Sequence, residues 1–385
     1  MNAKTTIKAA FPAAMLLFPG ALPAEQRTGY GANIVPIAVY GEDNRADYYE
    51  ADPVYQRLAD STAALFRARD VRLDPASGNA SIDLGRTIRD KFNLGEDERY
   101  GDQPFGSFCS SFLAGEDLVV TAAHCFTEYA PEDTNISYRD TVFVFGYAVT
   151  RAGAFPTEVP AENVFAFKEL VSARYDKDGA DYAVIRLNRK VPAERFPLAV
   201  NRGAAPAAGA RLFAIGYPSG MPVKIAGSAT IRRVHADKGF FVSDLDTFKG
   251  NSGSPVFNAD TMMIEGVLTR GGTDYIHTES DGTVYYDPRR PGGYSPGETY
   301  VLGQDEGRGE DVTLIGRLKD FLPVTEFERA LLEAEKRNVP MRAPSLRDSG
   351  VVPAVYRPGE QGGAFVPAVY YPDENDIPEP TILSI

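Results

Sequence analysis

Three short segments of the chain carry the residue types needed for nucleophilic acyl transfer. Ser252 lies in a Gly-Asn-Ser-Gly-Ser-Pro segment, His124 in Thr-Ala-Ala-His-Cys, and Asp181 opens Asp-Tyr-Ala-Val-Ile-Arg-Leu. A serine hydroxyl is a poor nucleophile until a neutral imidazole removes its proton, and the imidazole needs a buried carboxylate to fix its tautomer. We therefore predict that Ser252 is a nucleophile, His124 its general base and Asp181 the acid that orients the base.

The settings of the histidine and the aspartate suit these roles. His124 follows an apolar, β-type run over residues 118–121, and two alanines between them leave room for a tight turn. Asp181 begins an apolar run, which predicts a carboxylate at the edge of a buried strand. Asp176 and Asp178 are competitors for the same role, but their polar surroundings are typical of a solvated turn.

The glycines around Ser252 predict a site for a developing negative charge. The backbone must turn sharply for the N–H groups of Gly250 and Ser252 to converge on the carbonyl oxygen under attack. Each such donor contributes about 3–4 kcal/mol in a transition state. Because Gly253 has no Cβ, the chain can pass close behind the nucleophile. The other two histidines, His235 and His277, have no such setting and are expected to be ordinary surface or loop residues.

In the chain order His, Asp, Ser, these motifs resemble the chymotrypsin-like (trypsin-like) serine protease family, over roughly residues 101–320. Three details resemble the bacterial glutamyl endopeptidase branch more closely. They are the nucleophile motif continuing into Pro255 and Val256, the Asp244-Leu245 pair before it, and residues 39–45, which are similar to the mature N-terminus of those enzymes.

The resemblance implies an all-β fold of two antiparallel β-barrels with the site between them, a C-terminal helix and an extended tail. It implies a serine endopeptidase that hydrolyses peptide bonds through an acyl-enzyme, with protein or peptide substrates. It also implies a disulfide between Cys109 and Cys125, the only cysteines, next to the catalytic histidine. The alternatives are a catalytically silent relative that uses the fold for binding, and an esterase or other acyl transferase.

The resemblance leaves the substrate preference open. Asp246 stands six residues before Ser252, where trypsin-like enzymes have the floor of the primary pocket and a carboxylate selects Arg or Lys. Glutamyl endopeptidases have a small or hydroxyl residue there and a histidine on a later strand. That strand has no histidine here; its Thr269, Arg270 and Gly271 match the family's substrate-binding segment. Arg270 could bind an acidic substrate group, or pair with Asp246 and leave neither free.

Composition excludes several other classes of function. The chain has 385 residues, 43% of them hydrophobic, and 40 Lys+Arg against 53 Asp+Glu give a formal charge of -13. An acidic chain without basic clusters is a poor candidate for binding nucleic acid or an anionic membrane. Two cysteines and three histidines show no metal-ligand spacing, and no phosphate-binding glycine loop occurs. We expect no metal and no cofactor.

The ends of the chain predict export and a tail. Residues 1–24 combine lysines, an apolar stretch and a small residue, as in a signal peptide, so the protein is expected to be secreted or periplasmic. Residues 25–38 would be a propeptide and 39–100 an N-terminal arm; alternatively, Val39 simply opens a surface strand. The protease domain would span 101–322, followed by a helical, Pro/Gly-rich extension over 323–385.

Short runs rich in Val, Ile, Phe and Tyr, separated by turn residues, predict the strands of an all-β domain. The predicted strands cover residues 108–113, 118–121, 142–149, 164–167, 182–187, 211–215, 230–234, 240–243, 255–257 and 263–269. Residues 312–321 predict a closing helix from apolar residues at helical spacing. A second helix is predicted over 326–338, with Thr325 and Glu328 forming a capping box.

Overall fold

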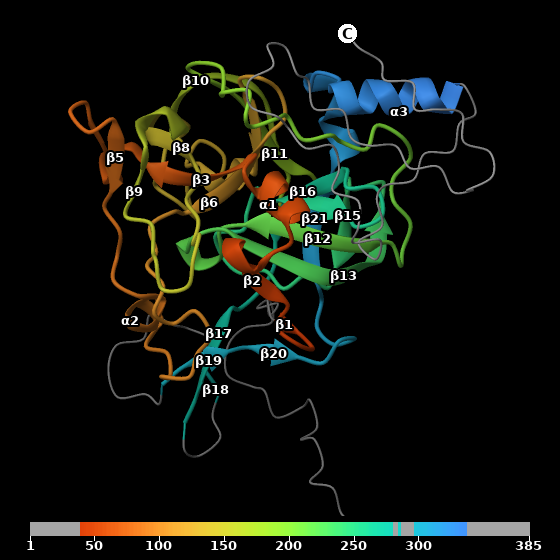
Figure 1. The fold of residues 1–385 in the computed structure, drawn as a ribbon. Helices are drawn as coiled ribbons and strands as arrows, with labels where there is room; N and C mark the ends of the chain where they lie inside the picture. Colours follow the sequence, from red (N-terminus) through yellow and green to blue (C-terminus); the bar gives the residue numbers. More distant parts are fainter. Residues whose placement is uncertain (1–38, 280–283, 286–295, 337–385) are drawn as a thin grey trace, which may run out of the picture. The chain divides into compact units, whose positions relative to one another are not determined.

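The computed structural model describes residues 39–279, 284–285 and 296–336 (Figure 1). The chain separates into a unit of Met1–Ile34 and a unit of Val35–Ile385, and the fold below belongs to the second. The predicted signal peptide, the predicted propeptide and the tail beyond residue 336 lie outside the described residues.

Six antiparallel strands close into the first barrel, in the order β10-β11-β7-β6-β3-β8. Successive side chains of a strand point to opposite faces, so one set fills the barrel. Phe143, Phe145 and Ile185 meet there without exposed surface. The strands are β3 (Thr62–Arg67), β6 (Cys109–Leu113), β7 (Leu118–Thr121), β8 (Thr141–Phe145), β10 (Val164–Tyr175) and β11 (Asp181–Leu187).

A second six-stranded barrel follows, in the order β12-β15-β16-β21-β14-β13, and pairing of β12 with β13 closes it. Phe241, Val256 and Leu268 lie in its core. The predicted fold class is therefore confirmed. The strands are β12 (Arg211–Gly216), β13 (Lys224–His235), β14 (Phe240–Ser243), β15 (Pro255–Asn258), β16 (Ile264–Arg270) and β21 (Glu310–Leu314), and β2 (Arg45–Asp47) adds to the outer edge of β13.

An apolar cluster joins the two barrels. It contains Val120 and Val184 from the first barrel together with Phe213 and Val267 from the second, all nearly or fully buried. The burial of apolar side chains in this cluster is the main favourable free-energy term that keeps the two barrels together. The barrel edges next to this cluster are consequently held in a fixed relation, which a site built from both barrels requires.

Strand β3 of the first barrel comes from the segment predicted to be an N-terminal arm. The sequence does not predict this strand, because Thr-Ala-Ala-Leu-Phe-Arg has a weak β signal and no polar alternation. The structure explains the pattern, since both faces of the strand are buried: Leu65 points into the barrel and Phe66 into the cluster between barrels, each with 0% exposure. The barrel therefore begins before residue 101, at Thr62.

The helix predicted over residues 312–321 is wrong. Residues up to Leu314 belong to β21, whose Val312 and Leu314 both face the core of the second barrel, as alternate residues of a strand do. Two short 3₁₀ turns follow, Ile315–Arg317 and Lys319–Phe321. The helical spacing was a coincidence of a strand running into turns. The second predicted helix is present as α3 (Glu326–Lys336), and its last two predicted residues lie outside the described part.

Smaller elements surround the barrels. In the described ranges, no helix is long and apolar enough to cross a membrane. β1 (Val39–Tyr40) pairs in parallel with β20 (Val301–Leu302); in Figure 1 the two lie side by side. The remaining elements are α1 (Pro53–Ala59), β4 (Val71–Asp74), β5 (Asn79–Ile82), α2 (Ile88–Phe92), β9 (Glu158–Pro160), β17 (Tyr275–Thr278), β18 (Val284–Tyr285) and β19 (Glu298–Thr299).

Glu328 of α3 gives a test of how the C-terminal helix is attached. Its carboxylate, 3% exposed, accepts the N–H groups of Val200 at 2.6 Å and Thr325 at 3.0 Å, and pairs with Arg202 at 2.8 Å. Glu328→Ala leaves all three donors without their acceptor and should destabilise the protein by about 3 kcal/mol in urea unfolding. The exposed Glu326→Ala on the same helix is the control. Equal effects of the two changes would contradict this account.

Candidate active site

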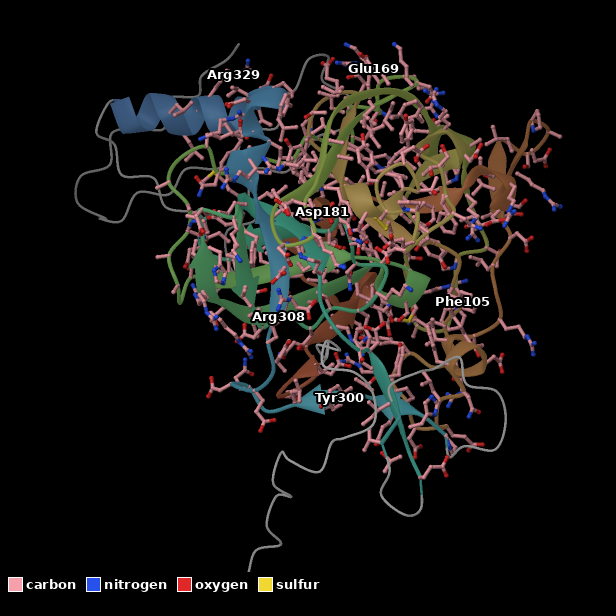
Figure 2. All side chains as sticks on the ribbon, turned by 180° about the vertical axis from the view of Figure 1, so that it is seen from behind. Phe105, Glu169, Asp181, Tyr300, Arg308 and Arg329 are labelled. Atoms are coloured by element: carbon pink, nitrogen blue, oxygen red, sulfur yellow. A yellow bond between two sulfur atoms is a disulfide. The ribbon has the colours of Figure 1, made fainter. Side chains whose placement is uncertain are left out.

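The barrels bring together the three residues of the predicted nucleophilic system. His124 lies in the 3₁₀ turn directly after β7, and Asp181 is the first residue of β11. Strands β7 and β11 are paired neighbours, so the two side chains start from adjacent strand ends. Ser252 comes from the second barrel, on the loop between β14 and β15. Figure 2 labels Asp181 where strands of the two barrels meet.

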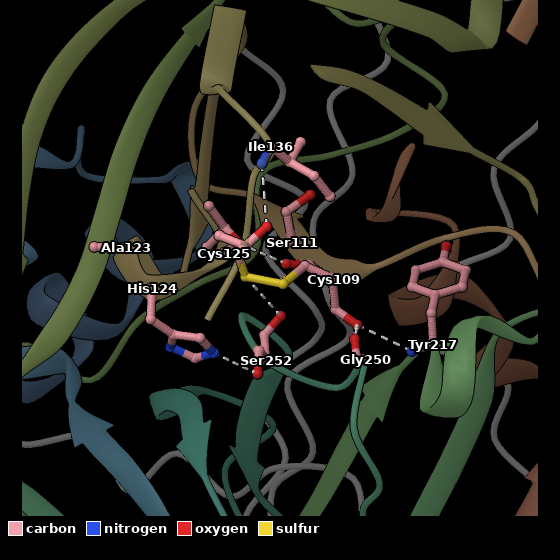
Figure 3. The surroundings of a disulfide bond; sticks show 12 residues. Cys109, Ser111, Ala123, His124, Cys125, Ile136, Tyr217, Gly250 and Ser252 are labelled. Atoms are coloured by element: carbon pink, nitrogen blue, oxygen red, sulfur yellow. Dashed lines mark hydrogen bonds between the residues drawn. A yellow bond between two sulfur atoms is a disulfide. The ribbon is translucent and has the colours of Figure 1, made fainter. Parts of the chain in front are cut away.

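Two hydrogen bonds connect the three side chains. His124 Nδ1 lies 2.6 Å from Asp181 Oδ2, and His124 Nε2 lies 2.8 Å from Ser252 Oγ. Because a carboxylate only accepts, the imidazole carries its proton on Nδ1 and presents the lone pair of Nε2 to the hydroxyl. Figure 3 shows the ring of His124 directed at Ser252.

Asp181 is fully buried and matched by donors from the histidine turn. Its Oδ1 accepts the N–H groups of Ala123 at 2.7 Å and His124 at 3.2 Å. These bonds fix the carboxylate plane and thereby the position of the imidazole. Asp176 instead accepts the N–H of Asp178 within an exposed turn, so the structure brings Asp181, and neither competitor, to the histidine.

The backbone around Ser252 adopts conformations that only glycine accommodates well. Gly250 has φ of 104° and Gly253 φ of 90°. A Cβ on Gly253 would lie 2.1 Å from the carbonyl oxygen of Ser110 and 2.3 Å from Thr121 Oγ1. The N–H of Ser110 also bonds the carbonyl oxygen of Ser252 at 2.8 Å. The nucleophile loop therefore lies directly on β6 and β7 of the first barrel.

The N–H groups of Gly250 and Ser252 are available to a ligand. Among the described residues, neither group donates a hydrogen bond. The carbonyl of Gly250 is fixed by Ser110 Oγ at 2.8 Å, and the same hydroxyl oxygen accepts the N–H of Tyr217 at 3.0 Å. The N–H of Gly250 shares a peptide with the carbonyl of Lys249, which accepts the N–H of Ser219 at 2.5 Å, and the N–H of Ser252 shares one with the carbonyl of Asn251, which accepts the N–H of Ser254 at 2.8 Å. Both peptides are thus held with their N–H sides free, as an oxyanion site requires.

A disulfide joins Cys109 of β6 to Cys125 of the histidine turn, with a Cα–Cα distance of 6.3 Å (Figure 3). Cys125 Sγ lies 3.9 Å from the carbonyl oxygen of Ser252. Since a disulfide sulfur has no proton, this approach is a packing contact. The bridge therefore ties the turn that carries His124 to the strand that supports Ser252.

The residues predicted to set substrate preference are engaged within the protein. Both oxygens of Asp246 accept backbone N–H groups, Oδ1 from Tyr40 at 2.8 Å and Oδ2 from Asn44 at 2.9 Å, and the residue is 2% exposed. Arg270 pairs with Asp311 at 3.0 Å. The structure therefore does not bring Asp246 and Arg270 together, and the predicted alternative of a pair between them is wrong.

Thr269 lies on β16, and Gly271 lies just beyond its end. Thr269 is buried, and its Oγ1 donates to the carbonyl oxygen of Asp311 at 3.2 Å, which binds β16 to β21. Arg270 also donates to the carbonyl oxygens of Asp176 and Gly179, so its guanidinium is occupied on several sides.

Two residues of β21 contribute to the site and were missed. The N–H of Asp181 donates to Thr313 Oγ1 at 2.9 Å, and that hydroxyl donates to the carbonyl oxygen of Asp181 at 3.0 Å. Glu310 accepts from Thr247 Oγ1 at 2.7 Å, and burial raises the pKa of Glu310 well above its usual range. No sequence signal pointed to either residue. Thr313 lies within the residues predicted to form a helix, and that prediction is wrong.

Neither of the remaining histidines is part of this arrangement. His277 is 5% exposed and lies in β17, so its expected surface position is wrong, whereas His235 ends β13 and lies beside the ring of Phe240. Over the described residues, no group of three or more His, Cys, Asp or Glu side chains could hold a metal ion.

Gly253→Ala tests how tightly the loop is fitted. The added methyl group would meet Ser110 and Thr121 at distances no Cβ tolerates, so the loop must shift and Ser252 with it. We expect labelling of Ser252 by a fluorophosphonate to slow by about 100-fold or more, since a displacement near 1 Å has that effect on a reacting group. Gly227→Ala, where a Cβ meets open space, is the control. Unchanged labelling in Gly253→Ala would contradict the fit.

Comparisons with solved structures and with family models find proteins that are similar to this chain. Among solved structures, human heparin binding protein matches with a TM-score of 0.41 at 14% identity, covering 73% of this chain and 94% of that chain. A Glu endopeptidase matches with a TM-score of 0.37 at 15% identity, covering 68% and 94%. Comparison with curated proteins gives no match. Residues 109–264 match the family model described as a trypsin-like peptidase domain, so the predicted resemblance to this family is confirmed over these residues.

Proposed function

We propose that the protein is a serine endopeptidase that uses Ser252, His124 and Asp181 as one catalytic unit. The observation that carries the proposal is the unbroken connection from Asp181 through His124 to Ser252 Oγ, with separations of 2.6 and 2.8 Å. These separations lie within hydrogen-bond reach, the first requirement of a nucleophile and its general base.

The proposed reaction has two halves. Ser252 Oγ forms a bond to the scissile carbonyl carbon while its proton passes to His124 Nε2, and the free N–H groups of Gly250 and Ser252 stabilise the oxyanion. The C–N bond then breaks, His124 gives its proton to the leaving amine, and an acyl-enzyme remains. Water, deprotonated by His124, attacks the ester carbonyl carbon. The C–O bond to Ser252 then breaks, His124 returns the proton to Ser252 Oγ, and the acid is released. Asp181 stabilises the imidazolium in both halves.

A catalytically silent binding protein is the main alternative. It is disfavoured because no group of the described residues accepts a hydrogen bond from the N–H groups of Gly250 and Ser252, and because His124 Nε2 faces the hydroxyl that it would deprotonate. An esterase would use the same groups, so peptide cleavage rests on the family.

Cleavage after Arg or Lys stays a prediction, and the contacts of Asp246 argue against it. A pocket carboxylate that selects a basic side chain should keep acceptor capacity for it, whereas each oxygen of Asp246 already accepts an N–H. The glutamyl-type alternative meets a similar objection, because Arg270 is bound to Asp311.

We further propose that the protein acts in an oxidising compartment, secreted or periplasmic. Disulfides persist in such compartments and are rare in the cytosol, and Cys109 and Cys125 are bonded beside the proposed base.

The catalytic unit is tested by Ser252→Ala, His124→Ala and Asp181→Asn. Each change should lower turnover of a peptide substrate on the order of 10⁴-fold, because the three groups act together. A fluorophosphonate should label the wild type and fail to label Ser252→Ala. Asp178→Asn, in the exposed turn near Asp181, is the matched control and should keep full activity. Wild-type turnover in Ser252→Ala would refute the proposal.

The compartment is tested on protein purified from the exported fraction. When this protein is unfolded without reductant, thiol titration should find no reactive thiol. Replacing both Cys109 and Cys125 with Ala should lower the free energy of unfolding by about 3 kcal/mol, since the bridge closes a short loop. Two thiols per unreduced chain would show that no bridge forms.

A further inference from the structure

The loop of residues 244–251, which leads from β14 to Ser252, is anchored at nearly every residue by groups outside it. Thr247 bonds Glu310, and the N–H of Lys249 donates to the carboxylate of Asp274 at 3.0 Å. Asp246 binds a part of the chain that lies 206 positions earlier in the sequence, at Tyr40.

We propose that Asp246 is a positioning residue, which ties the N-terminal segment of residues 39–47 to this loop and thereby holds the N–H groups of Gly250 and Ser252 in place for catalysis. The inference rests on the proposed function, because it assigns Asp246 to the same reaction. It replaces the role in substrate selection that the position of Asp246 suggests.

The carboxylate of Asp246 has the geometry of a clamp. It is 2% exposed, and its two oxygens take one N–H each, from Tyr40 at 2.8 Å and from Asn44 at 2.9 Å. The two donors flank a bend of the segment, so one side chain fixes both sides of it. Burial raises the pKa of Asp246 to about 6, against the opposing effect of these two bonds, and at neutral pH the group is chiefly a carboxylate with two acceptors.

A second contact links the same segment to the same loop. The guanidinium of Arg45 lies 3.9 Å from the ring centre of Phe248, and Arg45 is 2% exposed. Asp43 pairs with Arg45 through both oxygens, at 2.9 and 2.8 Å. A buried, paired guanidinium over an aromatic face is attractive and geometrically fixed.

The segment is itself held from its other side, so it can serve as a support. β1 pairs with β20 through Val39 and Val301, and β2 pairs with β13 through Arg45 and Ala226. Val39 has no exposed surface and packs in a cluster with Phe248. The loop thus lies against a segment fixed by two separate strand pairings.

Gly250 shows why the loop needs such support. Glycine adopts positive and negative φ with similar ease, so the φ of 104° at Gly250 is not fixed by the residue itself and depends on the surroundings. A Cβ there would lie 2.6 Å from the carbonyl oxygen of Tyr217, so the loop is pressed against that residue. Without the clamp, the peptide between Lys249 and Gly250 can turn its N–H away from the position of the oxyanion.

The test uses Asp246→Asn in the full-length protein. The Asn side chain can accept one of the two N–H groups but presents its own NH₂ to the other. We expect labelling by a small alkyl fluorophosphonate, which has no side chain for the primary pocket, to slow about ten-fold or more. For peptides, kcat should fall by a similar factor while KM and the preference among side chains before the cleaved bond stay unchanged. Asp260→Asn, an exposed carboxylate paired with Arg211, is the charge control.

A second variant removes the contact between Arg45 and Phe248 instead of the one made by Asp246. Asp43→Asn combined with Arg45→Met removes the cation from Phe248 together with its partner carboxylate, and it does not change Asp246. Of the two cations paired with Asp43, only Arg99, whose side chain is 43% exposed, then lacks that partner. The same loss of labelling and kcat is expected. Thermal unfolding of both variants separates loss of position from loss of fold, and a decrease in labelling that only follows the unfolded fraction would overturn the inference.

The other outcomes are distinct. If Asp246→Asn is labelled at the wild-type rate but loses a preference for Arg or Lys, Asp246 is a pocket residue and the inference is wrong, while the proposed function stands. Wild-type labelling and wild-type preference in both variants also refute it. Failure of the probe to label the wild-type protein at Ser252 would overturn the proposed function and this inference together.

Discussion

The arrangement of the site depends on the burial of one carboxylate. Asp181 has no exposed surface, and a charged group removed from water is tolerated only where the protein supplies its hydrogen bonds. The N–H groups of Ala123 and His124 and the ring of His124 supply them from the first barrel. Thr313 of the second barrel binds the backbone of the same residue on both sides. One residue thereby sets the histidine and joins the two barrels.

The second constraint is steric rather than electrostatic. The nucleophile loop touches β6 and β7 so closely that Gly253 has no room for a side chain, and Gly250 is equally confined by Tyr217. The far end of the loop is held at Asp246 and Phe248, and these contacts decide the direction of its N–H groups. The site combines a rigid histidine turn, fixed by a disulfide, with a loop whose geometry is enforced from several sides.

The parts of the site that could be predicted from sequence are those whose chemistry shows in adjacent residues. Ser252 stands between glycines, His124 after an apolar strand and Asp181 before one, and these local contexts agree with the structure. Asp246 was interpreted from its spacing alone, and spacing does not show what a carboxylate binds; its donors come from the other end of the chain. β3 was missed because its two alanines bury both faces without the polar alternation of a half-exposed strand.

The pairing of β1 with β20 has a consequence for how the protein is made. Contacts between distant parts of a chain are slow to form, because loop-closure entropy opposes them before any bond is gained. The second barrel cannot close until β21 has been synthesised, and β1 has no partner strand until Val301 has emerged. During synthesis, Ser252 is therefore present before β20 and β21, although the segment of residues 39–47 that β20 helps to hold was made first. The order of translation itself delays the assembly of a complete site until nearly the whole described chain has left the ribosome.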